Sequence, residues 1–80
     1  MAKLTQKEKI MRHLEAYGTI DPMEGIRDYG IMRLASRISE LRKEGYIIIT
    51  DMIHGFNRFG EKTRYAEYHL EGWANNVRKV

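Results

Sequence analysis

Hydrophobic residues near the start of the chain recur at the spacing of a helix. They fall on one side of a 3.6-residue period and are Ile10, Met11, Leu14 and Tyr17. Thr5 and Glu8 have the spacing of a capping box, in which each side chain accepts a hydrogen bond from the other residue's backbone N–H. The pattern stops at Gly18, so it predicts a helix over residues 6–17.

A second, shorter helix is predicted from its start signals. Asp21 is a favoured N-cap residue, Pro22 suits the first helical position, and the acidic Glu24 follows at the third. We expect this helix to end near Tyr29–Gly30. The segment Thr19–Ile20, between the two helices, is long enough only for a single bridging strand.

The strongest helical pattern covers residues 31–44. Gly30 is expected to open a tight turn into this helix, and Gly45 to end it in the left-handed conformation. Its apolar stripe consists of Ile31, Leu34, Ala35, Ile38 and Leu41. The positions expected to face outward are Arg33, Ser36, Arg37, Glu40 and Lys43.

The period of the pattern changes to two after the third helix. Residues 46–54 are rich in β-branched and aromatic side chains, and residues 62–70 alternate, with Ala66, Tyr68 and Leu70 on one face. The two segments predict an antiparallel hairpin. Its loop, residues 55–61, has a glycine near each end and is longer than a two-residue turn requires, so we expect it to project as a wing.

The predicted order of helix, short strand, helix, helix, strand, loop and strand is the plan of a winged helix-turn-helix domain. It is an α+β class, mainly α, with three helices and a C-terminal hairpin wing. We expect one domain over residues 1–80, with a core at about 4–70 and a tail at 71–80 that shows no clear period.

The residues themselves resemble a known family. The stretch from Asp21 to Tyr46, above all GIMRLASRISELRKEGY at Gly30–Tyr46, is similar to short helix-turn-helix proteins found mainly in bacteriophages and other mobile elements. The resemblance runs from about Leu4 to Leu70 and implies this fold and DNA binding. The wing with its two phenylalanines and the tail with Trp73 do not match that family.

The expected core is too small to spare residues for a ligand pocket. Its predicted members are Ile10, Leu14, Ile26, Ile31, Leu34, Ile38, Leu41, Ile48, Tyr68 and Leu70. Met11, Met23, Met32 and Met52 are interpreted as gap-fillers in it. We expect Phe56 and Phe59 to fold back onto the core, with insertion into DNA or a protein as the alternative. Trp73 is expected on the first helix, or else in a twin subunit.

Composition and charge narrow the class of partner. The 80 residues carry a net charge of +3, which favours polyanionic partners slightly, and contain no cysteine, which excludes disulfides and thiolate metal sites. No apolar run approaches the ~18 residues that span a bilayer, so we expect a cytoplasmic protein without a membrane partner, in a bacterial host cell if the resemblance holds.

Catalytic motifs are missing from the sequence. His13, His54 and His69 lie far apart, and even if the last two approach across the hairpin, they have no fitting carboxylate motif for zinc. The sequence contains no phosphate-binding loop, nucleophile elbow or paired acidic motif. We therefore expect no enzyme activity, no cofactor and no metal.

The third helix carries the functional prediction. In a helix-turn-helix motif the second helix enters the major groove, where arginine can bind guanine through two hydrogen bonds. The predicted DNA-binding residues are Met32, Arg33, Ser36, Arg37 and Lys43 on this helix and Asn57, Arg58, Lys62 and Arg64 on the hairpin. Lys7, Lys9 and Arg12 of the first helix are further candidates for phosphate contacts, with ordinary solvation as the alternative.

The order of charges on the third helix is partly inverted. Arg33 and Arg37 stand early, and Glu40 and Glu44 late, which opposes the helix dipole and makes two like-charge pairs costing about 0.2–0.5 kcal/mol each. A bound anion would relieve this arrangement. The alternative is a merely solvated helix face, on which Arg37 can pair with Glu40.

These observations lead to one principal function and two alternatives. The principal function is sequence-specific binding of double-stranded DNA by residues 31–44 and the wing, as a small phage or mobile-element transcriptional regulator or recombination accessory factor, and a homodimer would supply the contacts that one small domain lacks. The first alternative is a phage-encoded inhibitor of a host defence or transcription complex. The second is RNA binding, for which the sequence offers no aromatic stacking platform.

Overall fold

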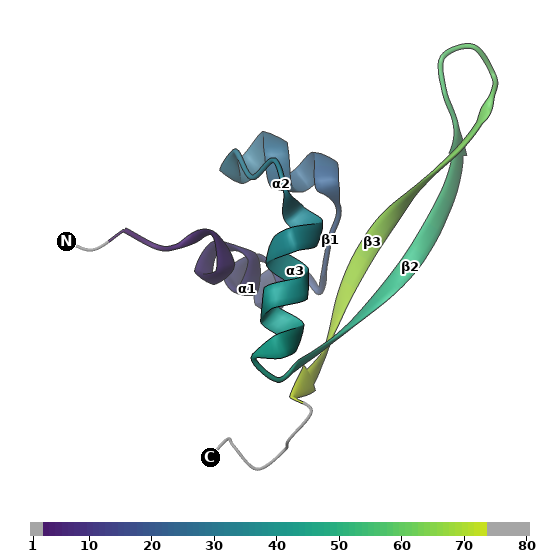
Figure 1. Ribbon diagram of the computed structural model, residues 1–80. Coiled ribbons are helices and arrows are strands. Elements are labelled where there is room, and N and C mark those ends of the chain that lie inside the picture. The colour runs from purple at the N-terminus through teal and green to yellow at the C-terminus, as the bar shows by residue number, and fades with distance from the viewer. Residues whose placement is uncertain (1–2, 74–80) are drawn as a thin grey trace.

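Three helices and a three-stranded antiparallel sheet make up the computed structural model, which describes residues 3–73 (Figure 1). In chain order the elements are α1 (Gln6–Tyr17), β1 (Thr19–Ile20), α2 (Pro22–Tyr29), α3 (Leu34–Lys43), β2 (Tyr46–Phe56) and β3 (Lys62–Trp73). The α+β class and the order of the elements predicted from the sequence are confirmed. No helix in this part of the chain combines the length and the apolar character needed to cross a membrane.

Reciprocal caps fix the starts of α1 and α2. The backbone N–H of Glu8 donates to the Thr5 hydroxyl at 3.1 Å, and the N–H of Thr5 donates to the Glu8 carboxylate at 2.7 Å. Asp21 and Glu24 repeat the same exchange at 2.9 and 3.0 Å. Both helices therefore begin where the sequence predicts, because the signals that start them are local.

The third helix begins three residues later than predicted, at Leu34. Gly30 adopts a left-handed conformation with φ of 68°, which reverses the chain at the end of α2. The next N–H, of Ile31, donates to the carbonyl of Gly25 at 2.9 Å, and the Ile31 side chain is fully buried. Because Ile31 is held by α2 and the core, it cannot also start α3.

The sheet has the order β1-β3-β2, with β3 in the centre. The short β1 pairs with β3 through Thr19 opposite His69 and Ile20 opposite Tyr68. Both long strands exceed their predicted ends, since β2 continues to Phe56, and β3 takes in residues 71–73, which were predicted to belong to the tail. The predicted packing of the Trp73 side chain and the rest of the tail fall outside the described residues.

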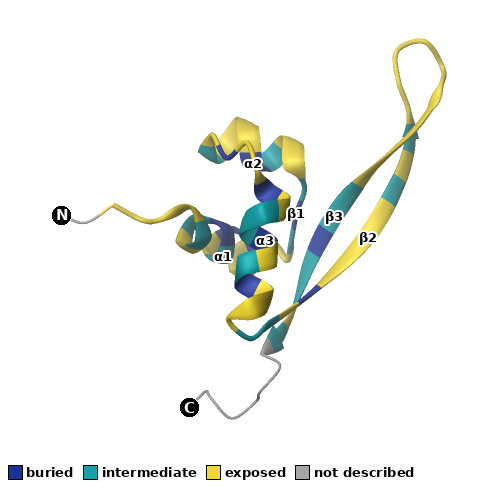
Figure 2. Ribbon diagram, viewed as in Figure 1, coloured by how far each residue is buried: buried dark blue, intermediate teal, exposed yellow. Residues whose placement is uncertain are grey.

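The outer part of the β2–β3 hairpin extends away from the helices, and we call its residues 53–65 the arm (Figure 1). The predicted projection of the hairpin is thus confirmed, although paired strand makes up most of it and the loop is shorter, covering residues 57–61. Figure 2 shows buried residues on the inner sides of the helices and near the base of the strands, whereas the outer end of the arm is exposed.

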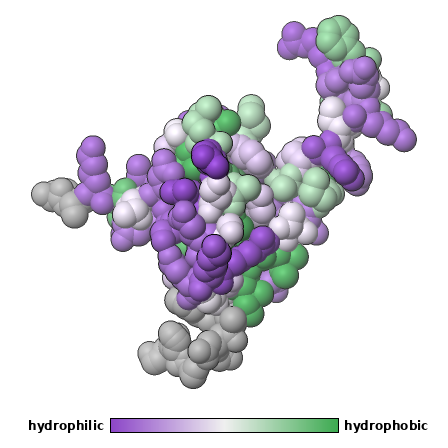
Figure 3. Space-filling model, viewed as in Figure 1, coloured by the Kyte–Doolittle hydropathy of each residue, from purple (hydrophilic) through white to green (hydrophobic). Residues whose placement is uncertain are grey.

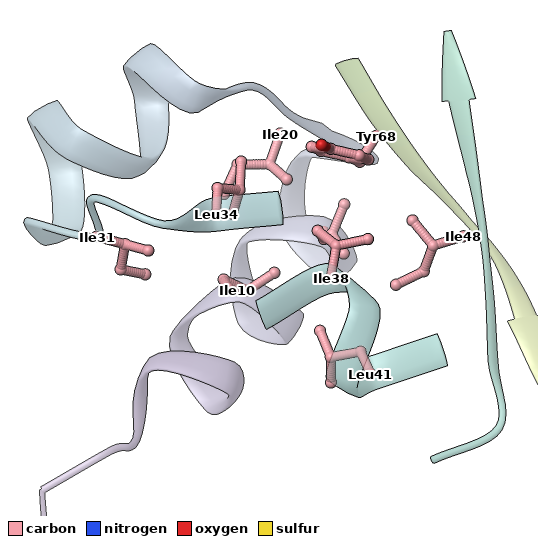
Figure 4. Packing of buried hydrophobic residues seen from close by; sticks show 9 residues of the cluster. Ile10, Ile20, Ile31, Leu34, Ile38, Leu41, Ile48 and Tyr68 are labelled. Atoms are coloured by element: carbon pink, nitrogen blue, oxygen red, sulfur yellow. The ribbon is translucent and has the colours of Figure 1, made fainter. Parts of the chain in front are cut away.

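The core lies between the three helices and the base of the sheet (Figure 4). Its buried members are Ile10, Leu14, Ile20, Ile31, Leu34, Ile38, Leu41, Ile48 and Tyr68. Two predictions were wrong in detail: Ile26 is 42% exposed on α2, and Leu70 is only partly buried against the cluster. Ile20 was missed because a two-residue strand has no period of its own.

Most of the methionines and both phenylalanines are more exposed than predicted. Met11 packs against the core, but Met23, Met32 and Met52 are 68%, 74% and 46% exposed, so the gap-filling interpretation was wrong for these three. Phe56 and Phe59 are 71% and 86% exposed. They do not fold back onto the core, because the arm carries them beyond its reach.

A buried polar contact joins α1 to α2. His13 is 5% exposed, and its Nδ1 lies 2.5 Å from the hydroxyl oxygen of Tyr29 in a hydrogen bond. The ring of Tyr29 also meets that of His13 edge-on. Burial raises the pKa of the Tyr29 hydroxyl above its usual 10.0, with a smaller contribution from the charge of Asp28. The folded structure therefore favours the neutral form of the Tyr29 hydroxyl.

Candidate nucleic-acid interface

The outward face of α3 carries hydroxyl groups and one lysine. Leu34, Ile38 and Leu41 are buried on the inner side, and successive residues are about 100° apart around a helix. The opposite side therefore presents Ser36, Ser39 and Lys43, of which Ser39 and Lys43 are exposed and Ser36 is half-buried. Sequence reasoning missed Ser39 because it placed the helix start too early.

Ala35 is a related correction. It was assigned to the apolar stripe, but the structure exposes it, because it stands about 100° from Leu34 around the helix. A small exposed residue beside Ser36 and Ser39 leaves room for close approach to this face of α3.

The N-terminus of α3 differs from those of the other two helices in the described part of the chain. Arg33 occupies the N-cap position but makes no capping hydrogen bond with its side chain, and the first turn contains no acidic residue. The first N–H groups of α3 therefore keep their partial positive charge. Arg33 and Met32 are exposed in the turn just before it, the latter at 74%.

Arg37 lies toward α1 instead of outward. It is half-buried, and its Nη2 lies 3.1 Å from a carboxylate oxygen of Glu40, which confirms the pairing considered from the sequence. Glu44 forms an ion pair with Lys7 of α1, and this hydrogen bond is the main cause of a raised Lys7 pKa. The late acidic residues of α3 thus have partners within the chain, and Arg37 and Lys7 are engaged with them.

Arg42 occupies the other flank of α3. Its Nε and Nη2 donate to the carbonyl of Ile48 at 3.0 and 2.6 Å, and Nη2 also donates to the Thr50 hydroxyl at 2.8 Å. These bonds tie α3 to β2. They also show that the Thr50 side chain lies on the face of the hairpin that adjoins α3.

The strand register divides the hairpin into two faces, because directly opposed residues share a face and alternate residues along a strand do not. We call the face with the buried Ile48 and Tyr68 the helix-side face, and the other the reverse face. The opposed pairs of the helix-side face are Ile48–Leu70, Thr50–Tyr68, Met52–Ala66, His54–Arg64 and Phe56–Lys62. Those of the reverse face are Ile49–His69, Asp51–Glu67, Ile53–Tyr65 and Gly55–Thr63.

Charge is segregated between these faces. Within residues 48–56 and 62–70, the helix-side face carries Lys62 and Arg64 and no acidic residue, whereas both acidic residues, Asp51 and Glu67, lie on the reverse face. Lys62 and Arg64 are exposed, and neither forms an ion pair with another described residue. The predicted pair thus lies together on one face, continuous with the surface next to α3.

Histidine and acidic side chains meet on the reverse face. His69 Nε2 lies 3.1 Å from a carboxylate oxygen of Asp51 and 3.2 Å from one of Glu67. The imidazole thus stands between two carboxylates that directly oppose each other across the ribbon. His54 and His69 do not approach each other, since they lie on opposite faces. No group of three metal-ligating side chains is placed to hold a metal ion within residues 3–73.

The end of the arm is a tight, internally bonded loop. The side-chain oxygen of Asn57 accepts the N–H groups of Phe59 and Glu61 at 2.9 and 3.0 Å, and its amide nitrogen donates to the Glu61 carboxylate at 2.8 Å. The side chain of Asn57, which was predicted to contact DNA, forms hydrogen bonds within the loop. Arg58 stands exposed beside it.

Hydrophilic side chains cover much of α3 and the arm in the view of Figure 3.

The comparisons with known proteins agree with the observed order of helices and strands. A family model described as a winged helix-turn-helix domain matches residues 5–72, which is most of the chain and includes the arm. Neither the curated proteins nor the solved structures contain a match to this sequence.

Proposed function

The chain belongs to the winged helix-turn-helix family, and on this premise we propose that it binds double-stranded DNA, with α3 in the major groove and the arm against the adjacent backbone. The observation that carries the proposal is the segregation of charge on the hairpin. A surface that binds phosphates needs cations that are exposed, unpaired and free of neighbouring carboxylates. Lys62 and Arg64 are exposed and unpaired, and the hairpin face that carries them has no acidic residue within residues 48–56 and 62–70.

The features of α3 support the same orientation. Ser36, Ser39 and Lys43 offer hydroxyl and ammonium groups to base edges and phosphates. The uncapped N-terminus with Arg33 favours a phosphate at that end of the helix. We assign Arg37 no direct contact with DNA, because its guanidinium is paired with Glu40.

We extend the proposal to a biological role through the resemblance noted above. Similarity of residues 21–46 to short phage and mobile-element proteins supports a small transcriptional regulator or recombination accessory factor in a bacterial host cell. A domain this small makes few contacts, so a homodimer or adjacent sites would supply the rest of the affinity. The proposed activity is binding without catalysis.

A second candidate function has one observation in its favour. Phe56 and Phe59 are largely exposed, and phosphate binding alone does not need them. An inhibitor that docks on a host protein complex through the arm would use such side chains as anchors. Salt dependence separates the two functions, because an aromatic-anchored protein interface responds far less to salt than phosphate binding does.

The test is the affinity for a fluorescein-labelled mixed-sequence duplex, measured by fluorescence anisotropy over a range of salt concentrations. We expect the double variant Lys62→Ala/Arg64→Ala to bind more weakly and to lower the slope of log K against log salt by about 1.8, since each phosphate contact contributes about 0.9. The control is Lys3→Ala/Arg27→Ala, which removes the same charge from exposed positions outside the hairpin.

We expect the control to retain most of the slope. Equal losses in the two double variants would show that only the net charge matters, and absence of duplex binding at low salt would remove the proposed function altogether.

A further inference from the structure

Phe59 is the most exposed of the large hydrophobic residues in the described part of the chain, at 86%. Leaving a phenylalanine in water forgoes the gain from burying its ring, so its position at the far end of the arm calls for a partner. The arm itself offers none, because Phe56, the nearest aromatic residue in the chain, is also 71% exposed.

Hydrogen bonds hold the backbone of the loop at Phe59 in place before any partner arrives. The N–H of Gly60 donates to the carbonyl of Asn57 at 3.0 Å, and the N–H of Asn57 donates to the carbonyl of Glu61 at 2.9 Å. Arg58 and Phe59 therefore occupy the two corner positions of the turn, and Gly60, with φ of 79°, takes the left-handed position that returns the chain to β3. Because the Asn57 side chain also bonds the N–H of Phe59, the backbone at Phe59 has little conformational freedom left to lose on binding.

Charge around the loop favours one class of partner. Arg58 adjoins Phe59, and Lys62 and Arg64 follow on the helix-side face. The nearby carboxylate of Glu61 is bound to the Asn57 amide. An exposed apolar ring at the end of an arm that carries cations matches a surface that is apolar between layers and anionic at its rim, which describes stacked base pairs between two phosphate backbones.

We propose that Phe59 is an apolar wedge that inserts from the minor groove between two base pairs, partly unstacks them and bends the duplex. This inference rests on the proposed function, because the arm must lie along DNA for its end to reach a groove. Insertion of Phe59 depends on how easily the DNA deforms and not on the identity of the bases. Pyrimidine–purine steps such as TA, which unstack easily, are therefore the favoured sites of insertion.

The experiment uses two 30-base-pair duplexes, one rich in TA steps and one built from stiff A-tracts, each with a donor and an acceptor dye at its ends. Wild type is expected to shorten the end-to-end distance of the TA-rich duplex and to bind it more tightly than the A-tract duplex. Phe59→Ala is expected to bind the TA-rich duplex roughly ten- to hundredfold more weakly, with the duplex left straight.

Two further variants separate the wedge from other roles of the loop. Phe59→Leu keeps an apolar wedge, so it should retain most of the bend. Arg58→Ala should lower the salt slope by about 0.9 but keep the bend. Met23→Ala, at a methionine 68% exposed on α2, is the matched control for removing an exposed apolar side chain and should leave affinity and bend unchanged.

The possible results are distinct. If wild type binds both duplexes without bending them, or if Phe59→Ala binds and bends as wild type does, the wedge is wrong while the proposed function stands. A protein-docking role for Phe59 would give that second result. If wild type binds neither duplex at low salt, the proposed function and the wedge fail together.

Discussion

Individual side chains in this protein differ in how far the sequence predicts their roles. Lys62 and Arg64 were predicted as binding residues and lie together on an exposed face. Arg42 and Asn57 have their polar groups engaged within the chain, by partners on β2 and in the arm loop. A helical or strand period tells which residues face outward, but it cannot tell which outward side chains find a partner on another element.

The hydrogen bond between Tyr29 and His13 leads to a prediction at the residue scale. Near neutral pH, Tyr29→Phe removes the partner of a buried ring nitrogen and should lower the free energy of unfolding by about 1–3 kcal/mol. The folded pKa of Tyr29 is raised, so the stability that its neutral form provides is present below pH 10.0 and is lost as the pH rises through that folded pKa.

The difference in the free energy of unfolding between wild type and Tyr29→Phe should therefore become smaller above pH 10.0, because only wild type loses the contribution of the neutral hydroxyl. Urea unfolding at pH 7 and at several values above 10 measures it. Tyr65→Phe, on the reverse face, controls for the loss of one tyrosine hydroxyl elsewhere in the protein. A gap that stays constant with pH would show that burial of the Tyr29 hydroxyl does not couple to folding.

The elements follow the sequence closely where their signals are local. The capping boxes of α1 and α2 place both starts correctly, since each box lies within four residues. The predicted start of α3 was wrong, because the actual start depends on the burial of Ile31, which is a tertiary contact that no local pattern encodes. The strand ends were missed for a similar reason, because cross-strand pairing carries both strands past their alternating segments.

Two glycines of the helix-turn-helix segment should respond in opposite ways to alanine. A Cβ at Gly25, inside α2, would meet the Ile31 carbonyl oxygen at 3.5 Å and the Leu34 side chain at 3.8 Å, which are ordinary contacts. Gly25→Ala should therefore stabilise the fold by about 0.5–1 kcal/mol through helix propensity and a less flexible unfolded chain. Gly30→Ala meets open space but must adopt φ of 68°, so it should destabilise by about 1–2 kcal/mol.

Thermal or urea unfolding of both variants provides the comparison. Destabilisation by Gly25→Ala would mean that α2 and the start of α3 pack more tightly than these distances indicate. A neutral Gly30→Ala would mean that the turn between the helices can adopt a second conformation.

At the scale of the whole molecule, the hairpin presents a basic face next to α3 and an acidic reverse face. The alternation along each strand was visible in the sequence. Which residues share a face across the hairpin depends on the register, and the sequence left that open because the loop length was uncertain by two residues. The sequence therefore predicted which residues bind but not how they are arranged. In the structure some of them, such as Lys62 and Arg64, face outward, whereas Arg37 and Asn57 are bonded to other residues of the chain.

We expect the helix-side face of the hairpin to contact DNA and the reverse face to point away from it. Because the chain has no cysteine, a single introduced thiol can be labelled at one chosen position. His54→Cys lies on the helix-side face and Thr63→Cys on the reverse face, and both native residues are exposed. They come from neighbouring strand pairs, so the twist of the ribbon affects them almost equally.

The measurement is photo-crosslinking of each variant, labelled with an azidophenacyl group at its thiol, to a mixed-sequence duplex. The account predicts strong crosslinking from position 54 and little from position 63. Equal crosslinking from both positions, or stronger crosslinking from position 63, would contradict the assignment of the helix-side face to the duplex.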